Sequence, residues 1–231
     1  MAFDDFDEYE QSEQVRKWLR ENGLSIVIGV VLALALIFGW RQWQAHRAIH
    51  GAQAAERYAA LQTALASGQS AQVDSAAATL EKDYADSPYA ALGAAARADL
   101  AVGQGRLDEA HAAMQWAVDH EKTAALLSLY ILRLARVELA QDKAKQALAH
   151  LDSMPARDYR AMAQELRGDA LLKLGHATDA RNAYAAALTA LSKDAAPGQR
   201  QLLQMKLDDL ALHIAQPPLA QPLAQPGKQG T

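Results

Sequence analysis

The stretch DEAHAAM, residues 108–114, is one of four similar stretches that decide the fold of this chain. Its counterparts are DSAAATL at residues 74–80, KQALAHL at 145–151 and TDARNAY at 178–184. Each carries an alanine at its third position, and successive alanines lie 34, 37 and 33 residues apart: Ala76, Ala110, Ala147 and Ala180. Self-similarity at a period of about 20 to 50 residues is typical of proteins built from stacked repeats.

Two further positions of this alignment are occupied by residues of similar size in all four stretches, and helix packing explains why. Twelve positions before the alanine stands a small residue: Ala64, Ala98, Ala135 and Gly168. Four positions after it stands a large apolar residue: Leu80, Met114, Leu151 and Tyr184. Two antiparallel helices approach closely only where one side lacks bulk, and a large neighbour then fills the groove beside the crossing point. The pattern and the period predict tetratricopeptide-like helix pairs, with a generic helical bundle as the alternative.

The composition favours helices throughout. Alanine supplies 52 of the 231 residues, and no strand-like alternation competes with it. We therefore predict an all-α chain with a single N-terminal transmembrane helix, followed over residues 44–215 by a tetratricopeptide-like α-solenoid of about four helix pairs. Residues 198–215 predict a capping helix with an apolar side formed by Leu202, Leu203, Leu207, Leu210 and Ile214. Residues 216–231 hold four prolines and predict a disordered tail.

Residues 24–43 predict a transmembrane anchor. From Asn22 to Trp40, 19 residues carry no charge, and a helix of that length reaches nearly across a hydrocarbon layer of about 30 Å. Trp18 precedes the run and Trp43 follows it, in positions where indole rings favour the headgroup region. A cleavable signal would have a positive start and a shorter apolar core, so we expect the anchor to stay uncut.

The charges around the anchor predict its orientation. Arg16, Lys17 and Arg20 lie close before it, whereas the arginines that follow it are more widely spread. Clustered basic residues favour the cytoplasmic side of a membrane, and acidic residues contribute little to this rule. We therefore expect residues 1–23 to form an acidic cytoplasmic tail and residues 44–215 to form a periplasmic domain.

Small residues recur at four-residue spacing within the anchor: Ser25, Gly29 and Ala33. Such a stripe lets another transmembrane helix approach closely, so it predicts a lateral packing site. The alternative is that these residues are filler, since glycine and alanine are common in membrane helices.

Charge and motifs exclude several functional classes. Beyond residue 23, 20 basic and 20 acidic residues cancel, which argues against binding to nucleic acid. The chain has no cysteine, phosphate-binding glycine loop or nucleophile motif, and His46 and His50 have metal-ligand spacing without a third ligand nearby. We predict a protein that is not an enzyme, with no catalytic residues, metal, cofactor or small-molecule substrate.

Protein binding remains, because the first helices of stacked repeats line a concave groove. Extending the alignment to that face gives four groove candidates: Tyr58, Asp99, Arg136 and Asp169. Four more residues are expected close by: Leu92, Leu129, Arg133 and Glu165. Most charged residues on helices are merely solvated, so each of these side chains is a candidate rather than an assigned contact.

The order of these parts resembles a known family, the ancillary subunit of the bacterial SecYEG translocon, of the YfgM type, with a tetratricopeptide-like domain. The stretches that carry the resemblance are EQVRKWLRENG (13–23), GWRQWQAH (39–46), LRLARVELAQDKAKQALAHLD (132–152), RGDALLKLGHATDARNAY (167–184) and QMKLDDLAL (204–212). The resemblance covers most of residues 13–212 and brings no catalytic motif with it.

The resemblance implies a bacterial inner-membrane protein associated with the SecYEG channel and with a membrane-anchored periplasmic chaperone of the prolyl-isomerase type. It implies a role in passing translocated chains to periplasmic chaperones, and a cytoplasmic tail linked to an envelope-stress response regulator. The acidic start FDDFDEYE, residues 3–10, and the proline-rich tail are not part of the resemblance. The alternative is a membrane-anchored adaptor for cell-envelope assembly or division machinery, which would need the same parts.

Overall fold

The computed structural model describes residues 4–155, 159–191 and 197–215, and all regular secondary structure in these ranges is helical. In chain order the helices are α1 (Asp4–Ala66), α2 (Ser70–Asp83), α3 (Pro88–Gly103), α4 (Leu107–His120), α5 (Ala124–Ala140), α6 (Ala144–Asp152), α7 (Arg160–Lys173), α8 (Ala177–Ala190) and α9 (Pro197–Ala215). The predicted all-α class is confirmed. The predicted tail, residues 216–231, lies outside the described residues.

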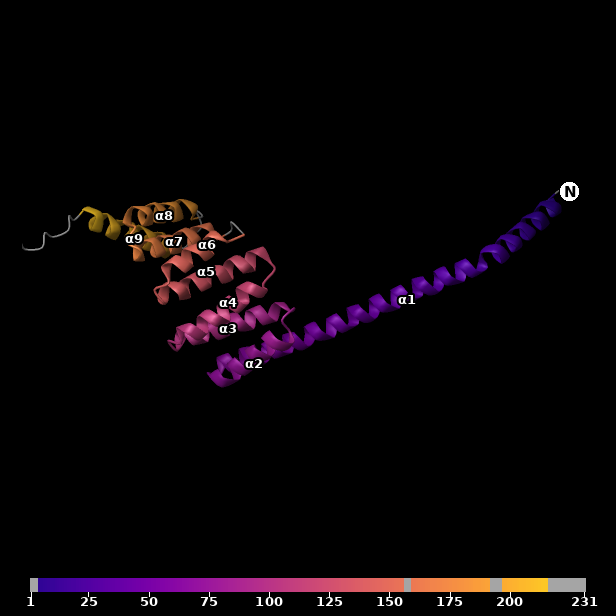
Figure 1. Cartoon of the computed structure of the whole chain (residues 1–231), viewed down its shortest axis with the longest axis horizontal. Helices are drawn as coiled ribbons and strands as arrows, with labels where there is room; N and C mark the ends of the chain where they lie inside the picture. Colours follow the sequence, from indigo (N-terminus) through magenta and orange to yellow (C-terminus); the bar gives the residue numbers. More distant parts are fainter. Residues whose placement is uncertain (1–3, 156–158, 192–196, 216–231) are drawn as a thin grey trace, which may run out of the picture. The chain divides into compact units, whose positions relative to one another are not determined.

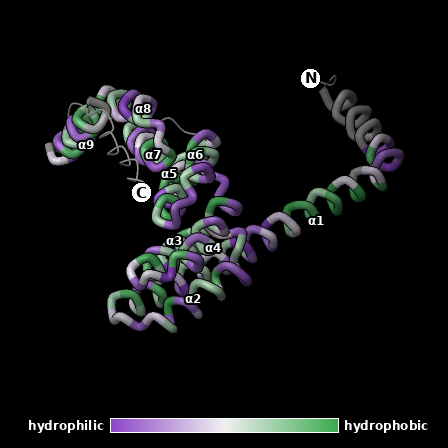
Figure 2. Tube along the Cα trace, turned by 60° about the vertical axis from the view of Figure 1, so that its left-hand side comes forward, coloured by the Kyte–Doolittle hydropathy of each residue, from purple (hydrophilic) through white to green (hydrophobic). Residues whose placement is uncertain are grey.

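The chain divides into two compact units between Gln53 and Ala54. The first unit consists of α1 up to that point and contains the predicted anchor. By length and composition α1 carries a candidate membrane span within Val27–Ala66, with a mean hydropathy of 1.4, and none of its most apolar window is buried. The apolar stretch of α1 is green in Figure 2. Because a core helix of a soluble protein would bury such a stretch, the exposure favours an anchor.

Aromatic and basic side chains mark the C-terminal end of the apolar stretch. The Trp40 and Trp43 rings lie 5.1 Å apart between centroids, and the Arg47 guanidinium lies 4.6 Å from the centre of the Trp43 ring. Indole rings and arginine side chains of this kind are typical of the headgroup region of a membrane.

The second unit is a stack of helix pairs (Figure 1). Within each pair a tight turn places one residue in the left-handed backbone region, with φ of 67°, 72°, 59° and 80°: Gly68, Gly105, Asp142 and Gly175. Glycine suits this region because it lacks a Cβ, and aspartate tolerates it better than most residues. In each case the second helix of the pair begins two residues later. The last turns of α1 form the first helix of the first pair, with α2 as its partner.

These turns correct the alignment of the first repeat. The fifth residue after each turn residue is buried in all four pairs: Val73, Ala110, Ala147 and Ala180. The sequence alignment placed Ala76 at this position of the first repeat, but that residue is only half-buried. The first repeat is therefore shifted by three residues, and the repeat spacing becomes 37, 37 and 33. The run of alanines in α2 offered small residues at several positions and hid the shift.

With this register, a small residue on one helix of a pair is matched by a large residue on the other helix. The residue seven before the turn and the residue nine after it form four pairs: Leu61 with Ala77, Ala98 with Met114, Ala135 with Leu151, and Gly168 with Tyr184. Each pair combines one small and one large residue, and the first repeat has the order reversed. Packing is tightest in the last pair, where a Cβ on Gly168 would overlap the Tyr184 ring. A close-packed crossing needs constant total volume rather than a fixed residue at one position.

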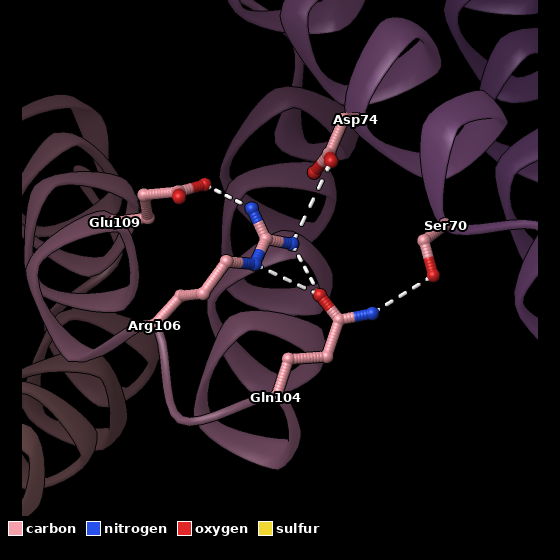
Figure 3. A network of polar contacts seen from close by, with 5 residues as sticks. All are labelled: Ser70, Asp74, Gln104, Arg106 and Glu109. Carbon is pink, nitrogen blue, oxygen red and sulfur yellow. Dashed lines mark hydrogen bonds and ion pairs between the residues drawn. The ribbon is translucent and has the colours of Figure 1, made fainter.

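Polar contacts link successive turns along one edge of the stack. Gln104, in the second turn, donates to Ser70 Oγ at 2.9 Å at the start of α2. Arg106 binds Gln104 and Glu109 and lies 3.7 Å from an Asp74 carboxylate oxygen (Figure 3). These side chains are partly or largely solvent-exposed, so their contacts add little to stability.

A buried carboxylate joins three helices in the middle of the stack. Glu138 of α5 is fully buried, and its oxygens lie 3.3 Å from His111 Nε2 of α4 and 2.9 Å from His150 Nδ1 of α6. A buried carboxylate without hydrogen bonds would be costly, and the two imidazoles provide them.

The closing helix α9 confirms the predicted cap but changes its apolar face. Leu203 and Leu210 are buried and Leu207 is partly buried, as expected. The prediction that Leu202 belongs to the buried apolar side is wrong, because 46% of this residue is exposed. Its position points it away from α8, which α9 packs against. The side chain of Ile214 lies outside the described residues.

Candidate protein-binding groove

The first helices of the first three pairs enclose a hollow of about 350 Å³, which we call cavity A. Its lining comes from α1, α3 and α5: Tyr58, Gln62, Leu65, Leu92, Ala95, Ala96, Asp99, Leu100, Leu126, Leu129, Tyr130 and Arg133. Five of the eight groove candidates are in this set. The structure therefore brings Tyr58, Leu92, Asp99, Leu129 and Arg133 together, while their role in binding stays a prediction.

A second hollow of about 330 Å³, cavity B, lies beside it between α3, α4 and α5. Arg136, another candidate, lines cavity B together with Val102 and Val137. Asp99 and Arg133 line both hollows, and Arg133 Nη1 donates to Asp99 Oδ2 at 3.2 Å. Because 64% of the Asp99 side chain and 36% of the Arg133 side chain are exposed, this pair adds little stability.

The remaining two candidates, Glu165 and Asp169, line neither hollow. Lys206 Nζ of α9 donates to Glu165 at 2.9 Å and to Asp169 at 2.7 and 3.0 Å. Tyr184 Oη also donates to Asp169 at 2.7 Å. Burial opposes the charged form of Lys206, but these carboxylates outweigh it and raise the pKa of the lysine. At this end of the array the closing helix, rather than open groove, faces the two acids.

Tyr130 is a lining residue that the sequence did not reveal. Its side chain is buried, and its hydroxyl has no hydrogen-bond partner among the described residues. Burial raises the pKa of this phenol to about 12, the charge of Glu121 adds to the rise, and Arg133 opposes it. A buried hydroxyl normally finds a partner, so this orphaned donor, which protein atoms cover, is a feature to explain.

Gln62 is the other lining residue missed from the sequence. It stands six residues before the turn residue Gly68, and in the later repeats that position holds Asp99, Arg136 and Asp169. Its Nε2 donates to Tyr58 Oη at 2.6 Å. The corrected register of the first repeat would have found Gln62, whereas no repeat pattern points to Tyr130.

The small-residue stripe of the anchor belongs to the first unit. Ser25, Gly29 and Ala33 are exposed on α1, and a Cβ built on Gly29 would meet no atom within 4 Å. The stripe is thus accessible to another helix, and its packing role stays a prediction.

Comparisons with known proteins agree with this architecture. The sequence profile of the tetratricopeptide repeat-like domain matches residues 16–212. A protein of Escherichia coli named ancillary SecYEG translocon subunit is 30% identical over 207 residues, which cover 89% of this chain and 97% of that protein. Proteins of the same name from Haemophilus influenzae and Neisseria gonorrhoeae are each 25% identical, over 88% of this chain and 98% and 97% of their own lengths. No solved structure matches the chain.

The matched range includes both the apolar stretch of α1 and the helix pairs through most of α9. The similarity to the translocon subunits likewise extends over nearly their whole length. The names and the domain point to a scaffold subunit rather than to a catalyst. On this basis the chain belongs to the tetratricopeptide repeat-like family, in its YfgM-type branch of ancillary SecYEG translocon subunits.

Proposed function

We propose that this protein is a membrane-anchored, protein-binding scaffold, an ancillary subunit of the Sec translocon that helps to hand translocated chains to periplasmic chaperones. The observation that carries the proposal is the 30% identity to the Escherichia coli subunit over 97% of its length. A match of that extent includes the anchor and the repeats, not the repeat architecture alone. Repeat arrays by themselves serve many partners and would not favour one function.

The physical arrangement supports a binding role at a membrane. One chain carries both an exposed apolar stretch in α1 and the cavities of the repeat unit. Confinement to a membrane surface raises the effective concentration of a groove near a channel, so weak contacts with an emerging chain are sufficient. The partners in this proposal are the SecYEG channel and a membrane-anchored periplasmic chaperone of the prolyl-isomerase type.

The proposal includes a topology. Residues 1–23 lie in the cytoplasm, residues 24–43 cross the inner membrane and residues 44–215 lie in the periplasm. The clustered Arg16, Lys17 and Arg20 support this direction. The cytoplasmic tail is then the part available to an envelope-stress response regulator.

Site-specific photocrosslinking in native membranes tests the proposal. A photoreactive residue at Gly29 is expected to capture a channel subunit through the small-residue stripe, and one at Tyr58 is expected to capture a periplasmic chaperone or a translocating chain. Val31 is the matched control for the stripe, because it is also exposed but lies about 200° around the helix from Gly29. Capture of division or cell-wall proteins alone would overturn the proposal in favour of an envelope-assembly adaptor.

A reporter fusion tests the topology separately. A reporter that is active only in the periplasm is expected to be active after Thr231 and inactive when it replaces residues before Arg16. The reverse pattern would reverse the orientation and remove the proposed contact with periplasmic chaperones.

A further inference from the structure

We propose that cavity B binds a small amphiphilic carboxylate, the size of a medium-chain fatty acid, with its aliphatic chain in the cavity and its carboxylate on Arg136. The proposal goes beyond the scaffold function. Its ligand is bound without being converted, so it is not a substrate, and the site does not depend on the translocon. The carrying observation is an exposed guanidinium without a partner at the mouth of an apolar cavity.

The interior of cavity B is apolar. Its most deeply buried lining residues are Ala98, Met114 and Val137, which are 0%, 1% and 6% exposed. The flexible side chain of a methionine adapts its shape to a neighbouring group. Val102 also lines the cavity and is 45% exposed. An aliphatic chain that covers Val102 and enters the cavity therefore removes apolar surface of both partners from water.

The size of cavity B sets the length of the ligand. Its volume is about 330 Å³. An apolar protein cavity of about 150 Å³ holds one benzene molecule, so each carbon takes roughly 25 Å³ and cavity B holds about a dozen atoms. A saturated chain of about eight to twelve carbons therefore fills the cavity and leaves its carboxylate at the mouth.

The charges that line cavity B favour one negative charge on the ligand. Arg133 and Arg136 lie one turn apart on α5, and Asp99 binds Arg133 at 3.2 Å. Arg136 is exposed and has no hydrogen-bond or ion-pair partner among the described residues. A guanidinium presents two parallel N–H donors that match the two oxygens of a carboxylate. A single carboxylate is therefore complementary to the uncompensated charge of Arg136.

Two other hollows of the array lack this combination. In cavity A the charged lining residues are Asp99 and Arg133, which compensate each other. A third hollow of about 300 Å³ lies between the α2–α3 and α4–α5 connections and is lined by Asp86, Glu121 and Lys122 among others. Basic charge is not in excess there. Of the three hollows, cavity B is therefore the one whose charge attracts an anion.

Photoaffinity labelling of the full-length protein in lipid nanodiscs tests the proposal. The probe is decanoate with a diazirine near its methyl end, and mass spectrometry measures the labelling of α3, α4 and α5 as the probe concentration rises. As a competitor, decanoate is expected to be about sixteenfold more effective than octanoate, because each of its two further methylenes contributes about a factor of four. Decylamine has a similar chain and the opposite charge, so it is expected not to compete.

Two substitutions separate the charge from the apolar contact. Arg136→Gln is expected to weaken decanoate binding by about fivefold, as for a solvent-exposed ion pair, and to leave competition by uncharged 1-decanol unchanged. Val102→Ser is expected to weaken the binding of both compounds by about threefold, through lost apolar contact. Both side chains are exposed, so neither substitution is expected to disturb the fold.

Arg181→Gln is the matched control for Arg136→Gln. Arg181 of α8 is also exposed and has no hydrogen-bond or ion-pair partner in the described part of the chain, but it lines neither cavity. This variant removes the same charge from the protein as a whole. It is expected to bind decanoate as the wild type does.

Three outcomes would overturn the proposal. The first is labelling confined to α1, which would show that the probe only enters the lipid. The second is equal decanoate binding by Arg136→Gln and Arg181→Gln, which would show that Arg136 does not hold the carboxylate. The third is stronger competition by a short peptide with a C-terminal leucine, which would make the end of a polypeptide the occupant. The crosslinks from Gly29 and Tyr58 report on the scaffold function independently, so they show whether that function stands when the cavity proposal fails.

Discussion

Tyr130 and Tyr184 are equally buried, yet only one of the two hydroxyls has a partner within the described protein. Tyr184, on α8, donates to Asp169, and Lys206 of the closing helix binds the same carboxylate. Tyr130, on α5, lies at the wall of cavity A without a partner. The difference teaches that α7 and α9 satisfy the polar groups at the end of the array, whereas the earlier helices leave the Tyr130 hydroxyl among several buried polar atoms without a partner.

The comparison separates two tasks within a single repeat architecture. In the last pair, a large ring, a glycine and a charge cluster are committed to one another: Tyr184, Gly168, Asp169, Glu165 and Lys206. These contacts close the array against water. In the first three pairs, a hollow of about 350 Å³ remains between the first helices and one of about 330 Å³ between α3, α4 and α5. The contacts at the closed end are expected to stabilise the array, and the predicted binding residues lie mainly in the earlier repeats.

The largest effect is expected where the Tyr184 ring is held most tightly. A Cβ on Gly168 would overlap the ring, and the ring cannot move away without losing its bond to Asp169. Although alanine is the better helix former, we expect Gly168→Ala to lower the free energy of unfolding by about 2 to 3 kcal/mol. Urea denaturation followed by circular dichroism measures it. Adding Tyr184→Leu recreates the Ala135 and Leu151 pair of the preceding repeat and should restore part of the loss. Wild-type stability in Gly168→Ala would contradict the tight packing.

Alkaline pH is expected to have the next largest effect. Burial raises the pKa of Tyr130 from 10.0 to about 12. Between these values the unfolded chain loses a proton that the folded chain keeps, so the folded state loses stability as the pH rises. The Tyr130 contribution reaches about 2 kcal/mol at pH 12. The pKa of Tyr184 is also raised, first by burial and then by Asp169, so this residue adds to the loss.

Denaturation curves at several pH values measure this loss. Tyr130→Phe should lose less stability than the wild type between pH 10 and 12, and the two proteins should run parallel between pH 7 and 9. Identical alkaline profiles would show that the phenol is not protected by burial.

A smaller effect is expected for the charge cluster that closes the array. Burial lowers the pKa of Lys206, but Asp169 and Glu165 outweigh it, so the pKa of the folded state is raised. The stabilisation is therefore complete below the unfolded pKa of 10.5 and is lost as the pH rises through the folded value. At pH 7 we expect Lys206→Met to cost about 1 to 2 kcal/mol, less than for a fully buried pair because the groups are partly exposed.

Lys173→Met is the matched control for this substitution. Lys173 binds Asp142, but its side chain is 44% exposed and that of Asp142 is 84% exposed. Its replacement should change the stability by less than about 0.5 kcal/mol. Equal effects of the two substitutions would contradict a special role for α9 in closing the array.

The sequence predicted the fold because repeat period and helix propensity are local properties that survive in a single chain. The turns at Gly68, Gly105 and Gly175 use the residue best suited to a left-handed backbone. The register of the first repeat was not predictable in this way, because Leu61 and Ala77 reverse the order of small and large residues that the later repeats share. A volume exchange between two helices is visible only when both helices are placed.

The candidate groove was predictable in part for the same reason. Residues on one face of each first helix follow the repeat, so Asp99 and Arg136 could be located beside cavities from their spacing. Which acids α9 binds depends on where Lys206 lies in space, and the repeat gives no sign of it. The unmet hydroxyl of Tyr130 is a property of its surroundings rather than of its position in the repeat.

The smallest effect is expected at neutral pH, and its sign distinguishes the two tyrosines. Removal of an unsatisfied buried hydroxyl relieves a desolvation cost, so Tyr130→Phe should raise the free energy of unfolding by about 1 kcal/mol. Tyr184→Phe should lower it by about the same amount, because Asp169 loses a donor. The ring remains in both variants, so core packing is unchanged and urea denaturation reports the hydroxyl alone. A loss of stability in Tyr130→Phe would mean that the hydroxyl already has a partner in the folded protein, and the contrast between the two ends of the array would then rest on cavity shape alone.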